Sequence, residues 1–415
     1  MDAVVRDALS LTESGQARQA YDMLEPLEVT RAGDPDFDTV FGIAANQSGE
    51  YARAVMALER ATIVQPENTR ARAELGRAMF AVGDSKSART LLEQAKAQGA
   101  PPEAALTIDQ FLRAIDVAEA LAQSSFRGYV EATIGHDGNI SSGPTNPNVA
   151  VPLFGVNITL NPNSTKKSAS FANLTGGVSG RYVIDSRWSL IGNASFNDRV
   201  DINASQFSNT QLNFGAGGAY RLDKQDFSVV AVHEDYKVDG AMNRTQNGMV
   251  GEWVYRINNQ EEAGAYLQYS KLHYPGQSIR DAARTVVGAS YARQLGNGLL
   301  GWGGAYVGNE NPDASGVPYY GQSLKGLRAG LQKSFYDALS GFVALSYENR
   351  RYGGQDPFFL VKRKDNQTSL TLGLNWVPAK SWRISPQLSY VRNQSSLVIN
   401  DYDRTIYSVA ARYDF

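Results

Sequence analysis

The sequence lacks cysteine altogether and has only three histidines among its 415 residues. Without cysteine, the chain can form no disulfide, no thiolate metal site, no cysteine nucleophile and no lipid-modified cysteine. No stretch approaches the roughly 20 consecutive apolar residues that a membrane-spanning helix requires. No basic segment followed by an apolar one opens the chain, so we expect either a cytosolic protein or a mature chain without its signal peptide and with a start Met added.

A strong excess of basic residues is also missing, because the formal net charge is −2. Nucleic-acid-binding domains normally carry such an excess, so we expect no nucleic-acid partner. Residues 1–125 carry 12 Lys and Arg against 19 Asp and Glu, a net of −7, which leaves 28 against 23, a net of +5, for the remainder. The contrast predicts two domains, which we place at residues 1–124 and 125–415.

Motifs for catalysis are weak or absent. The run His233-Glu234-Asp235 is compatible with a metal or hydrolase site, but a polar strand end explains it more simply. We find no Ser, His and acidic set on matched strands. No phosphate-binding glycine-rich loop precedes a helix. We therefore expect a protein that is not an enzyme and that has no catalytic residues, no metal site and no other cofactor.

The first part of the chain repeats with a period of 34 residues. Three columns recur, and their members are Gly15, Gly49 and Gly83; Ala20, Ala54 and Ala88; and Leu24, Leu58 and Leu92. Paired antiparallel helices approach closely, which predicts Gly and Ala at the helix crossings and larger apolar residues in the gaps. The pattern resembles the tetratricopeptide repeat and predicts an α-solenoid over about residues 3–100. An amphipathic helix from Pro102 to about Ala122 is expected to cap it.

The resemblance to this repeat implies a concave groove that binds a partner. The family's groove positions, carried onto this chain, are Thr39, Ile43, Asn46, Arg70, Ala73, Arg77 and Phe80. An alternative interpretation is that Arg70 and Arg77 belong to a solvated helix face and pair with Glu74 and Asp84.

From Phe126 onward, apolar and polar residues alternate with period two. One such run places its apolar residues at Thr368, Leu370, Leu372, Leu374 and Trp376. The runs are about 12 to 15 residues long, whereas strands of soluble proteins usually have about five or six. Their length and their aromatic ends favour a closed antiparallel β-barrel in lipid.

The turns predict how many strands the barrel has. Six short turns lie at residues 185–186, 223–224, 258–259, 296–297, 336–338 and 378–380. Seven longer connections lie near residues 141–167, 200–206, 239–243, 274–280, 309–320, 353–362 and 395–401. Together they predict 14 strands, with both strand termini on the short-turn side. That side faces the periplasm, so we expect the repeat domain there too. The sequence leaves both an inward and an outward placement of residues 141–167 open.

The C-terminal segment alternates up to a final aromatic residue, through Tyr407, Val409, Ala411, Tyr413 and Phe415. A C-terminal Phe of this kind resembles the signal that the outer-membrane barrel assembly machinery reads. This predicts a barrel in the outer membrane of a Gram-negative bacterium, inserted by that machinery and surrounded by outer-membrane lipid. The alternative is a soluble all-β domain that ends in Phe by chance.

A short repeat domain that leads into a single 14-stranded barrel resembles the surface lipoprotein assembly modulators, called Slam. The segment from Gly135 to Ile140 looks like that family's Gly-x-Asp-x-Asn-hydrophobic motif, with Asp137 and Asn139 at its polar positions. The resemblance implies an outer-membrane translocon. Its client would be a surface lipoprotein or a secreted haem- or metal-acquisition protein, which it moves from the periplasm to the cell surface.

The same resemblance implies which barrel residues matter. They are Arg127, Tyr129, Glu131 and Thr133 on the lumen side of the first strand, Asp137 and Asn139 at its outer end, and Arg412 and Asp414 on the last strand. The seam between first and last strands is either a lateral gate or a lumen ion-pair network. Two further functions stay open. One is an exopolysaccharide export port, with Tyr266, Trp302 and Tyr306 on one face; the other is a passive porin with a periplasmic scaffold domain.

Overall fold

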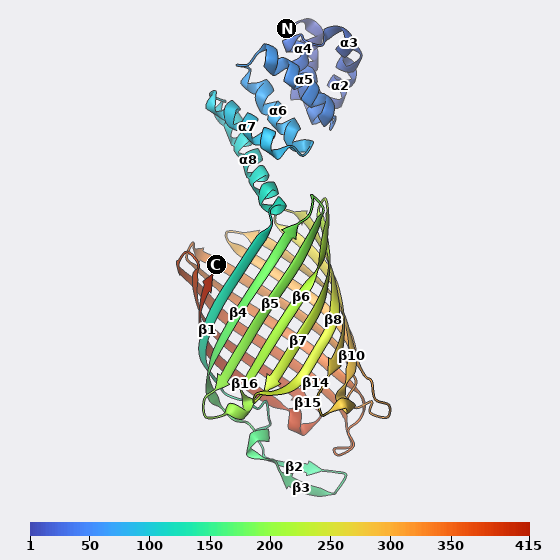
Figure 1. Cartoon of the computed structure of the whole chain (residues 1–415), viewed down its shortest axis with the longest axis vertical. Coiled ribbons are helices and arrows are strands. Elements are labelled where there is room, and N and C mark those ends of the chain that lie inside the picture. The colour runs from blue at the N-terminus through green and yellow to red at the C-terminus, as the bar shows by residue number, and fades with distance from the viewer. The chain divides into compact units, whose positions relative to one another are not determined.

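The computed structural model describes residues 1–415 apart from the side chains of residues 117–122. The chain divides into two compact units, Met1–Gln123 and Ser124–Phe415 (Figure 1). The first unit is helical and the second is a β-barrel, which confirms the predicted α-solenoid followed by a barrel. None of the helices that the structure describes is long and apolar enough to cross a membrane.

The helical unit is built from helices packed in pairs around small and apolar residues. The α-helices of the described chain are α1 (Ala3–Glu13), α2 (Ala17–Leu24), α3 (Glu28–Arg31), α4 (Pro35–Gln47), α5 (Tyr51–Val64), α6 (Thr69–Ala81), α7 (Ser85–Ala97) and α8 (Pro102–Ala122). Helix α4 packs on α5, and α6 packs on α7. Phe37, Phe41 and Leu58 are fully buried where these helices meet.

The repeated glycines of this unit have two separate roles. Gly49 follows the end of α4 with a φ of +85°, a left-handed conformation that favours glycine after a helix. Our prediction that this glycine column lies at helix crossings is therefore wrong. The crossings hold Gly42 and Gly76 instead, where a side chain would collide with Leu58 and Leu92 of the following helices.

The second unit closes 14 antiparallel strands into a barrel, counted over its described residues, in the order β1-β16-β15-β14-β13-β12-β11-β10-β9-β8-β7-β6-β5-β4. The predicted strand number is thereby confirmed. The barrel strands are β1 (Ser125–Asp137), β4 (Ala169–Val183), β5 (Trp188–Asp201), β6 (Asn209–Leu222), β7 (Gln225–Val238), β8 (Ala241–Asn258), β9 (Glu261–His273), β10 (Ala282–Gly296), β11 (Leu299–Pro312), β12 (Gln322–Tyr336), β13 (Leu339–Gln355), β14 (Lys362–Ala379), β15 (Trp382–Ser395) and β16 (Tyr402–Asp414).

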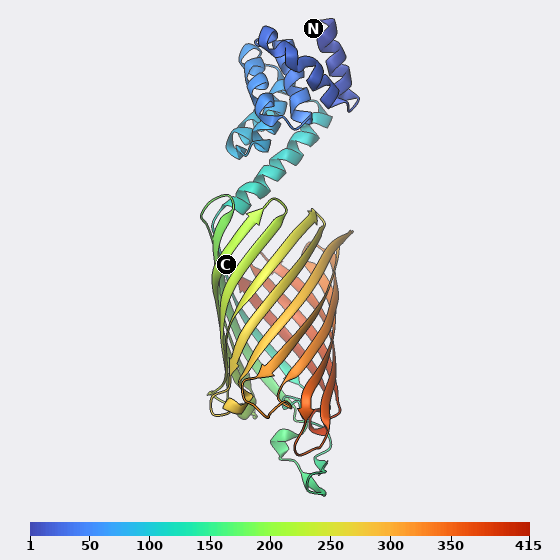
Figure 2. The same cartoon turned by 90° about the vertical axis from the view of Figure 1, so that its right-hand side faces the viewer.

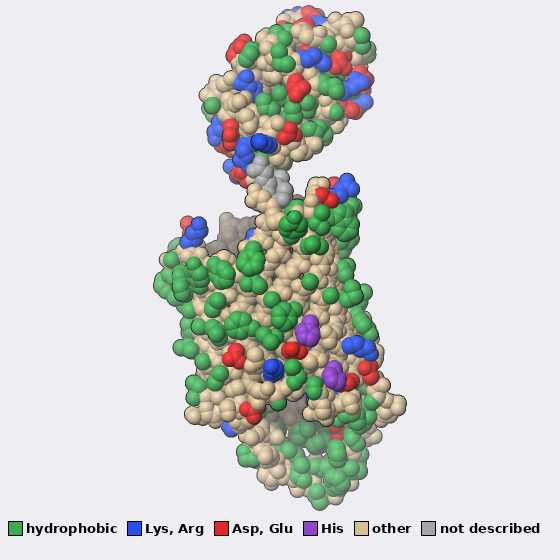
Figure 3. Space-filling view, viewed as in Figure 1, with side chains coloured by type: hydrophobic (Ala, Val, Ile, Leu, Met, Phe, Trp, Pro, Cys, Tyr) green, Lys and Arg blue, Asp and Glu red, His purple; other side chains and the backbone are tan. Residues whose placement is uncertain are grey.

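The period-two alternation separates an apolar outer wall from a polar lumen. On β14, Leu370, Leu372 and Trp376 are 38%, 43% and 49% exposed, whereas Thr371 and Gly373 between them face the lumen and are half-buried. Hydrophobic side chains cover much of the barrel wall that Figure 3 shows. An exposed apolar wall of this kind is stable only against lipid, and a closed ring leaves no strand edge unpaired there.

Short turns join the strands at one end of the barrel and longer loops join most of them at the other. One predicted longer loop, at residues 239–243, is wrong. Strands β7 and β8 are joined by Asp239 and Gly240 alone. Their φ values of 51° and 74° fit the two-residue turn that an Asp-Gly pair favours between antiparallel strands.

The connection between β1 and β4 carries a small hairpin, β2 (Asn148–Val151) and β3 (Val156–Thr159). In both Figure 1 and Figure 2 this hairpin projects beyond the ends of the barrel strands. Its tip contacts the loop between β13 and β14, where Leu153 donates a backbone hydrogen bond of 3.1 Å to Phe358. The hairpin therefore lies outside the strand ends, at the long-loop end of the barrel (Figure 1).

Candidate functional site

Strands β1 and β16 close the ring, and they form its shortest pairing. Their register covers nine residue pairs, from Tyr129 to Asp137 of β1. Each other neighbouring pair of described barrel strands registers eleven to fourteen. At the short-turn end, Gly128 and Phe415 exchange two backbone hydrogen bonds of 2.8 and 2.9 Å. The seam is thus paired along its length.

The lumen side of the seam carries several of the predicted site residues. Arg412 donates hydrogen bonds of 2.9 and 2.7 Å to Asp414, and its guanidinium lies 3.7 Å from the ring centre of Tyr129. Glu131 stands opposite Arg412 in register. Neither Glu131 nor Arg127 forms an ion pair with the residues that the structure describes. The structure therefore brings Tyr129, Arg412 and Asp414 together and leaves the other two at the edge of this group.

At the long-loop end of the seam, Asp137 is fully buried between two arginines. Its carboxylate accepts hydrogen bonds of 3.0 and 3.1 Å from Nε of Arg404 on β16, and one of 2.9 Å from Arg199 on β5. Arg199 in turn donates to buried Asp201, 2.7 Å away. Two carboxylates and two guanidiniums balance in charge, as a buried group of ions requires.

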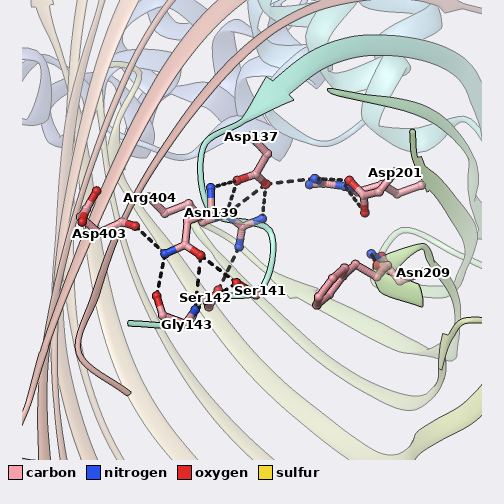
Figure 4. Close-up of polar contacts among 11 residues, drawn as sticks. Asp137, Asn139, Ser141, Ser142, Gly143, Asp201, Asn209, Asp403 and Arg404 are labelled. Carbon is pink, nitrogen blue, oxygen red and sulfur yellow. Dashed lines mark hydrogen bonds and ion pairs between the residues drawn. The ribbon is translucent and has the colours of Figure 1, made fainter. Parts of the chain in front are cut away.

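Asn139 extends this arrangement to the long loop. Its amide group is fully buried and donates to the carbonyl oxygens of Asp403, at 2.8 Å, and Gly143, at 3.0 Å. Its side-chain oxygen accepts a hydrogen bond of 3.0 Å from Ser141. Figure 4 shows how these side chains converge from β1, β5, β16 and the loop. We call the group of Asp137, Asn139, Arg199, Asp201 and Arg404 the seam clasp.

The motif predicted from the sequence supplies two of the five residues of the seam clasp. Sequence reasoning found Asp137 and Asn139 but missed Arg199, Asp201 and Arg404. Arg199 and Arg404 lie 62 and 267 residues from Asp137 along the chain. The signal available was their position as polar residues near the long-loop ends of strands, a feature that many other residues of this barrel share.

Aromatic rings in the lumen lie flat against glycines of neighbouring strands. A Cβ atom at any of these glycines would fall inside the facing ring. The pairs are Tyr129 with Gly177, Phe171 with Gly135, Tyr266 with Gly288, Trp302 with Gly330, Tyr306 with Gly326, and Phe342 with Gly373. The absent side chain lets each ring fold onto the wall instead of crossing the lumen. The large side chains thereby cover the backbone of the neighbouring strand.

The face shared by Tyr266, Trp302 and Tyr306 is therefore the lumen face. Tyr306 donates a hydrogen bond of 2.5 Å to Glu348, and Arg328 lies 4.9 Å from its ring centre. Each ring already packs on glycine or on a charged neighbour. The three residues consequently form part of the wall.

The run His233-Glu234-Asp235 is split between the two faces of β7. His233 lies on the outer wall, 2.7 Å from the side-chain oxygen of Asn247 and 3.3 Å from Asp235. Glu234 faces the lumen, where it pairs with Arg244. No group of three or more His, Asp or Glu side chains able to hold a metal occurs among the residues that the structure describes.

The predicted groove residues of the helical unit divide into buried and accessible ones. Ile43 and Asn46 are 1% exposed and Thr39 is 8% exposed. The Asn46 amide donates to the Glu74 carboxylate at 2.8 Å. Phe80 is half-buried and packs in the smaller apolar core. As placed, these four residues stabilise the array from within.

The accessible part of the groove is a depression of about 340 Å³ between α6, α7 and α8. Arg70, Ala73, Arg77 and Phe111 line it. Arg77 lies 3.6 Å from Glu74 and has its guanidinium 5.8 Å from the Phe111 ring centre, while Arg70 lies 3.4 Å from Glu13. Exposed ion pairs of this length are weak, so both arginines can exchange these partners for a ligand.

An ion pair with a fully buried carboxylate joins α4 to α5. Asp38 is fully buried and accepts hydrogen bonds of 2.7 and 3.1 Å from Arg60, which also lies 3.1 Å from Glu28. The hydrogen bonds to Asp38 raise the pKa of Arg60. The ion pair with Asp38 therefore favours the charged guanidinium.

Comparisons with known proteins agree with this architecture. The family model of the surface lipoprotein assembly modifier matches residues 126–415, and a tetratricopeptide repeat model matches residues 45–108. The hemophilin secretion modulator of Acinetobacter baumannii is 23% identical over 376 residues, which cover 86% of this chain and 74% of that protein.

Solved structures resemble each unit separately. OmpT, an outer membrane protein of Vibrio cholerae, is 10% identical with a TM-score of 0.41 and covers 70% of this chain and 97% of its own. The type III secretion translocator chaperone SycD of Yersinia enterocolitica is 19% identical with a TM-score of 0.25 and covers 28% of this chain and 91% of its own.

Substitution Asp137→Asn should weaken the barrel by about 3 kcal/mol, because it leaves the half-buried Arg404 and Arg199 with only Asp201 as a counter-charge. The measurement is thermal unfolding of the purified protein in detergent, followed by heat-modifiable migration on a gel. Asp198→Asn, on the exposed face of β5, is the matched control and should change little. Equal stability of the two variants would contradict a role for the seam clasp.

Substitution Gly326→Leu should displace the Tyr306 ring into the lumen and break its hydrogen bond to Glu348. We expect a loss of about 1–3 kcal/mol from overpacking and a lower ion conductance in planar bilayers. Gly218→Leu is the control, since nothing lies within 4 Å of a Cβ at Gly218. Unchanged conductance and stability in Gly326→Leu would show that the ring does not depend on the glycine.

Proposed function

The chain belongs to the surface lipoprotein assembly modifier family, and from this membership we propose that it is an outer-membrane translocon that moves a client protein to the cell surface. The observation that carries the proposal is that one chain joins a tetratricopeptide array to a closed 14-stranded barrel with a polar lumen. A client can be held by the array on one side of the membrane and leave through the barrel on the other.

The turn lengths support an orientation for this path. Both ends of the barrel sequence, at Ser125 and Phe415, belong to the short-turn end. Outer-membrane barrels place short turns in the periplasm and longer loops outside. We therefore propose that the helical unit, which precedes β1, is periplasmic and that the β2–β3 hairpin is exposed on the cell surface. The C-terminal strand would direct insertion by the barrel assembly machinery.

The name of the Acinetobacter relative indicates the class of client. That protein is a modulator of hemophilin secretion. By analogy we propose that the client here is a secreted protein or surface lipoprotein that serves haem or metal acquisition. The depression lined by Arg70, Ala73 and Arg77 is the proposed contact for this client or for a periplasmic chaperone that delivers it.

The two alternative functions have less support from the geometry. An exopolysaccharide port needs a continuous track of free ring faces, whereas the ring of Tyr306 is already covered by the guanidinium of Arg328, 4.9 Å from its centre. A porin with a constriction loop needs a loop folded into the lumen, whereas the β2–β3 hairpin points away from it (Figure 2). We therefore retain translocation as the conclusion.

Deletion of the gene should remove one or a few proteins from the cell surface or the medium and leave exopolysaccharide unchanged. Quantitative proteomics of surface and medium fractions, with a polysaccharide assay, measures both. Complementation with the intact chain is the control. Loss of polysaccharide alone would favour the export port, and no change in either would favour a porin or scaffold.

Export should continue when the seam is locked by a disulfide between Thr133→Cys and Ala410→Cys, which face each other in the β1–β16 register. The reason is that the seam clasp and backbone pairing already keep this seam closed, so the client passes through the lumen. Because the chain has no native cysteine, the engineered disulfide forms without competitors.

The matched control locks β14 to β15 through Thr371→Cys and Ser389→Cys, whose hydroxyls are 3.0 Å apart. Secretion of the client is measured with and without reductant. A block that only the seam disulfide produces, and that reductant relieves, would establish lateral gating in place of the lumen route.

A further inference from the structure

One sector of the outer wall carries a group of cations without counter-ions. Lys325 on β12, Arg351 on β13, and Lys362 and Lys364 on β14 are all exposed near the long-loop end of these strands. We call these four residues the basic patch. None of them forms an ion pair with any residue that the structure describes.

Other cations near the same end of the barrel are paired. Lys271 lies 2.9 Å from Asp313, Lys166 lies 2.7 Å from Asp403, and Arg392 lies 2.6 Å from Asp401. Each of these three basic residues therefore has a carboxylate partner within 3 Å. The four residues of the basic patch have no such carboxylate partner among the described residues.

The register makes this arrangement costly for the barrel alone. Arg351 faces Lys364 directly across the β13–β14 pair, and Lys325 faces Asn349, two residues from Arg351 on the same face. Like charges directly opposite on antiparallel strands destabilise a sheet. An anion bound between them would remove the repulsion.

The basic patch surrounds two adjoining depressions. Lys325 and Arg351 line the first, of about 370 Å³, together with polar Thr285, Asn309, Ser323 and Asn349. The second, of about 590 Å³, shares Arg351 and adds Lys362 and Lys364. One carboxylate, Glu310, also lines the second depression, but its register partners Arg284 and Gln322 belong to the lumen face.

The apolar wall begins directly below the first depression. Val287 and Val307 line it and are 49% and 59% exposed. Leu327, two residues from Lys325, is 60% exposed. A ligand that fills both regions must therefore combine anionic groups with hydrocarbon chains.

We propose that the basic patch binds the phosphate groups of a lipid A-type glycolipid of the outer leaflet, with its acyl chains on the apolar wall below. The leaflet follows from the proposed orientation of the barrel, on which this inference rests. Phosphate oxygens accept hydrogen bonds from guanidinium and ammonium groups. The bound lipid would fix the height of the barrel in the membrane on the β12–β14 side.

The test uses the full-length protein in detergent and titrates bisphosphorylated lipid A and the same lipid without its phosphates, followed by native mass spectrometry. Lys325→Gln, Arg351→Gln and Lys364→Gln are combined in one variant. Binding should weaken roughly a hundredfold, because each cation near an anionic lipid surface contributes about a factor of five. Wild-type protein should bind the dephosphorylated lipid as weakly as the variant binds lipid A.

The matched control removes the same charge at the other end through Lys224→Gln, Lys333→Gln and Lys380→Gln, and it should bind like wild type. Equal binding by the basic-patch variant and wild type would overturn the proposal, as would tight binding of the dephosphorylated lipid. Displacement of the lipid by inorganic phosphate would overturn the lipid assignment. If the triple variant does not fold, the single variants should each bind about fivefold more weakly.

Orientation is tested separately on whole cells with Asn157→Cys, in the β2–β3 hairpin, and Lys224→Cys, in a short turn. A membrane-impermeant maleimide should label only the former. Labelling of the latter alone would overturn the proposed orientation and the assignment to the outer leaflet, while the detergent titration would still report on the lipid site. The two failures are therefore distinguishable.

Discussion

The requirement that every backbone N–H and C=O group in lipid finds a partner governs this structure. It forces β1 to meet β16, although these strands stand at opposite ends of the barrel sequence. That junction has the shortest register in the described barrel, and each of its ends is reinforced. Gly128 and Phe415 join their backbones at the short-turn end, and Asp137 with Arg404 joins the strands at the long-loop end. Asp137, in the motif from Gly135 to Ile140, thus contributes to closing the ring.

A second consequence of the closed ring is that the lumen must be lined without being filled. Tyr306 on Gly326 and Trp302 on Gly330 show how the wall achieves this, since a large ring shields the backbone of the next strand while lying flat. Several glycines of the barrel therefore do more than reduce steric crowding, because each provides the surface on which an aromatic ring packs.

Much of the fold could be predicted because its signals are local. The alternation at Leu370 and Leu372 specifies which side meets lipid, and turn residues set the strand number. The error at Asp239 and Gly240 came from taking residues 239–243 as a loop when two residues suffice for a turn. The seam clasp escaped prediction because Arg404 reaches Asp137 across 267 residues, and nothing in the local spacing marks that contact. Burial of Asn46 likewise depends on how neighbouring helices stack.

The energetics of the seam bear on how a client crosses. Opening β1 from β16 would expose the hydrogen-bonding groups of nine residue pairs to lipid, where each lost bond costs about 4–6 kcal/mol. Breaking the buried ion pairs of Asp137 would add about 3–5 kcal/mol. The total free-energy cost reaches tens of kcal/mol. The outer membrane has no nucleotide whose hydrolysis could provide it. Folding of a client outside the cell releases about 5–15 kcal/mol, which is enough to prevent its return but not to open the wall. This difference in free energy supports the proposed path through the closed lumen over a path through an opened seam.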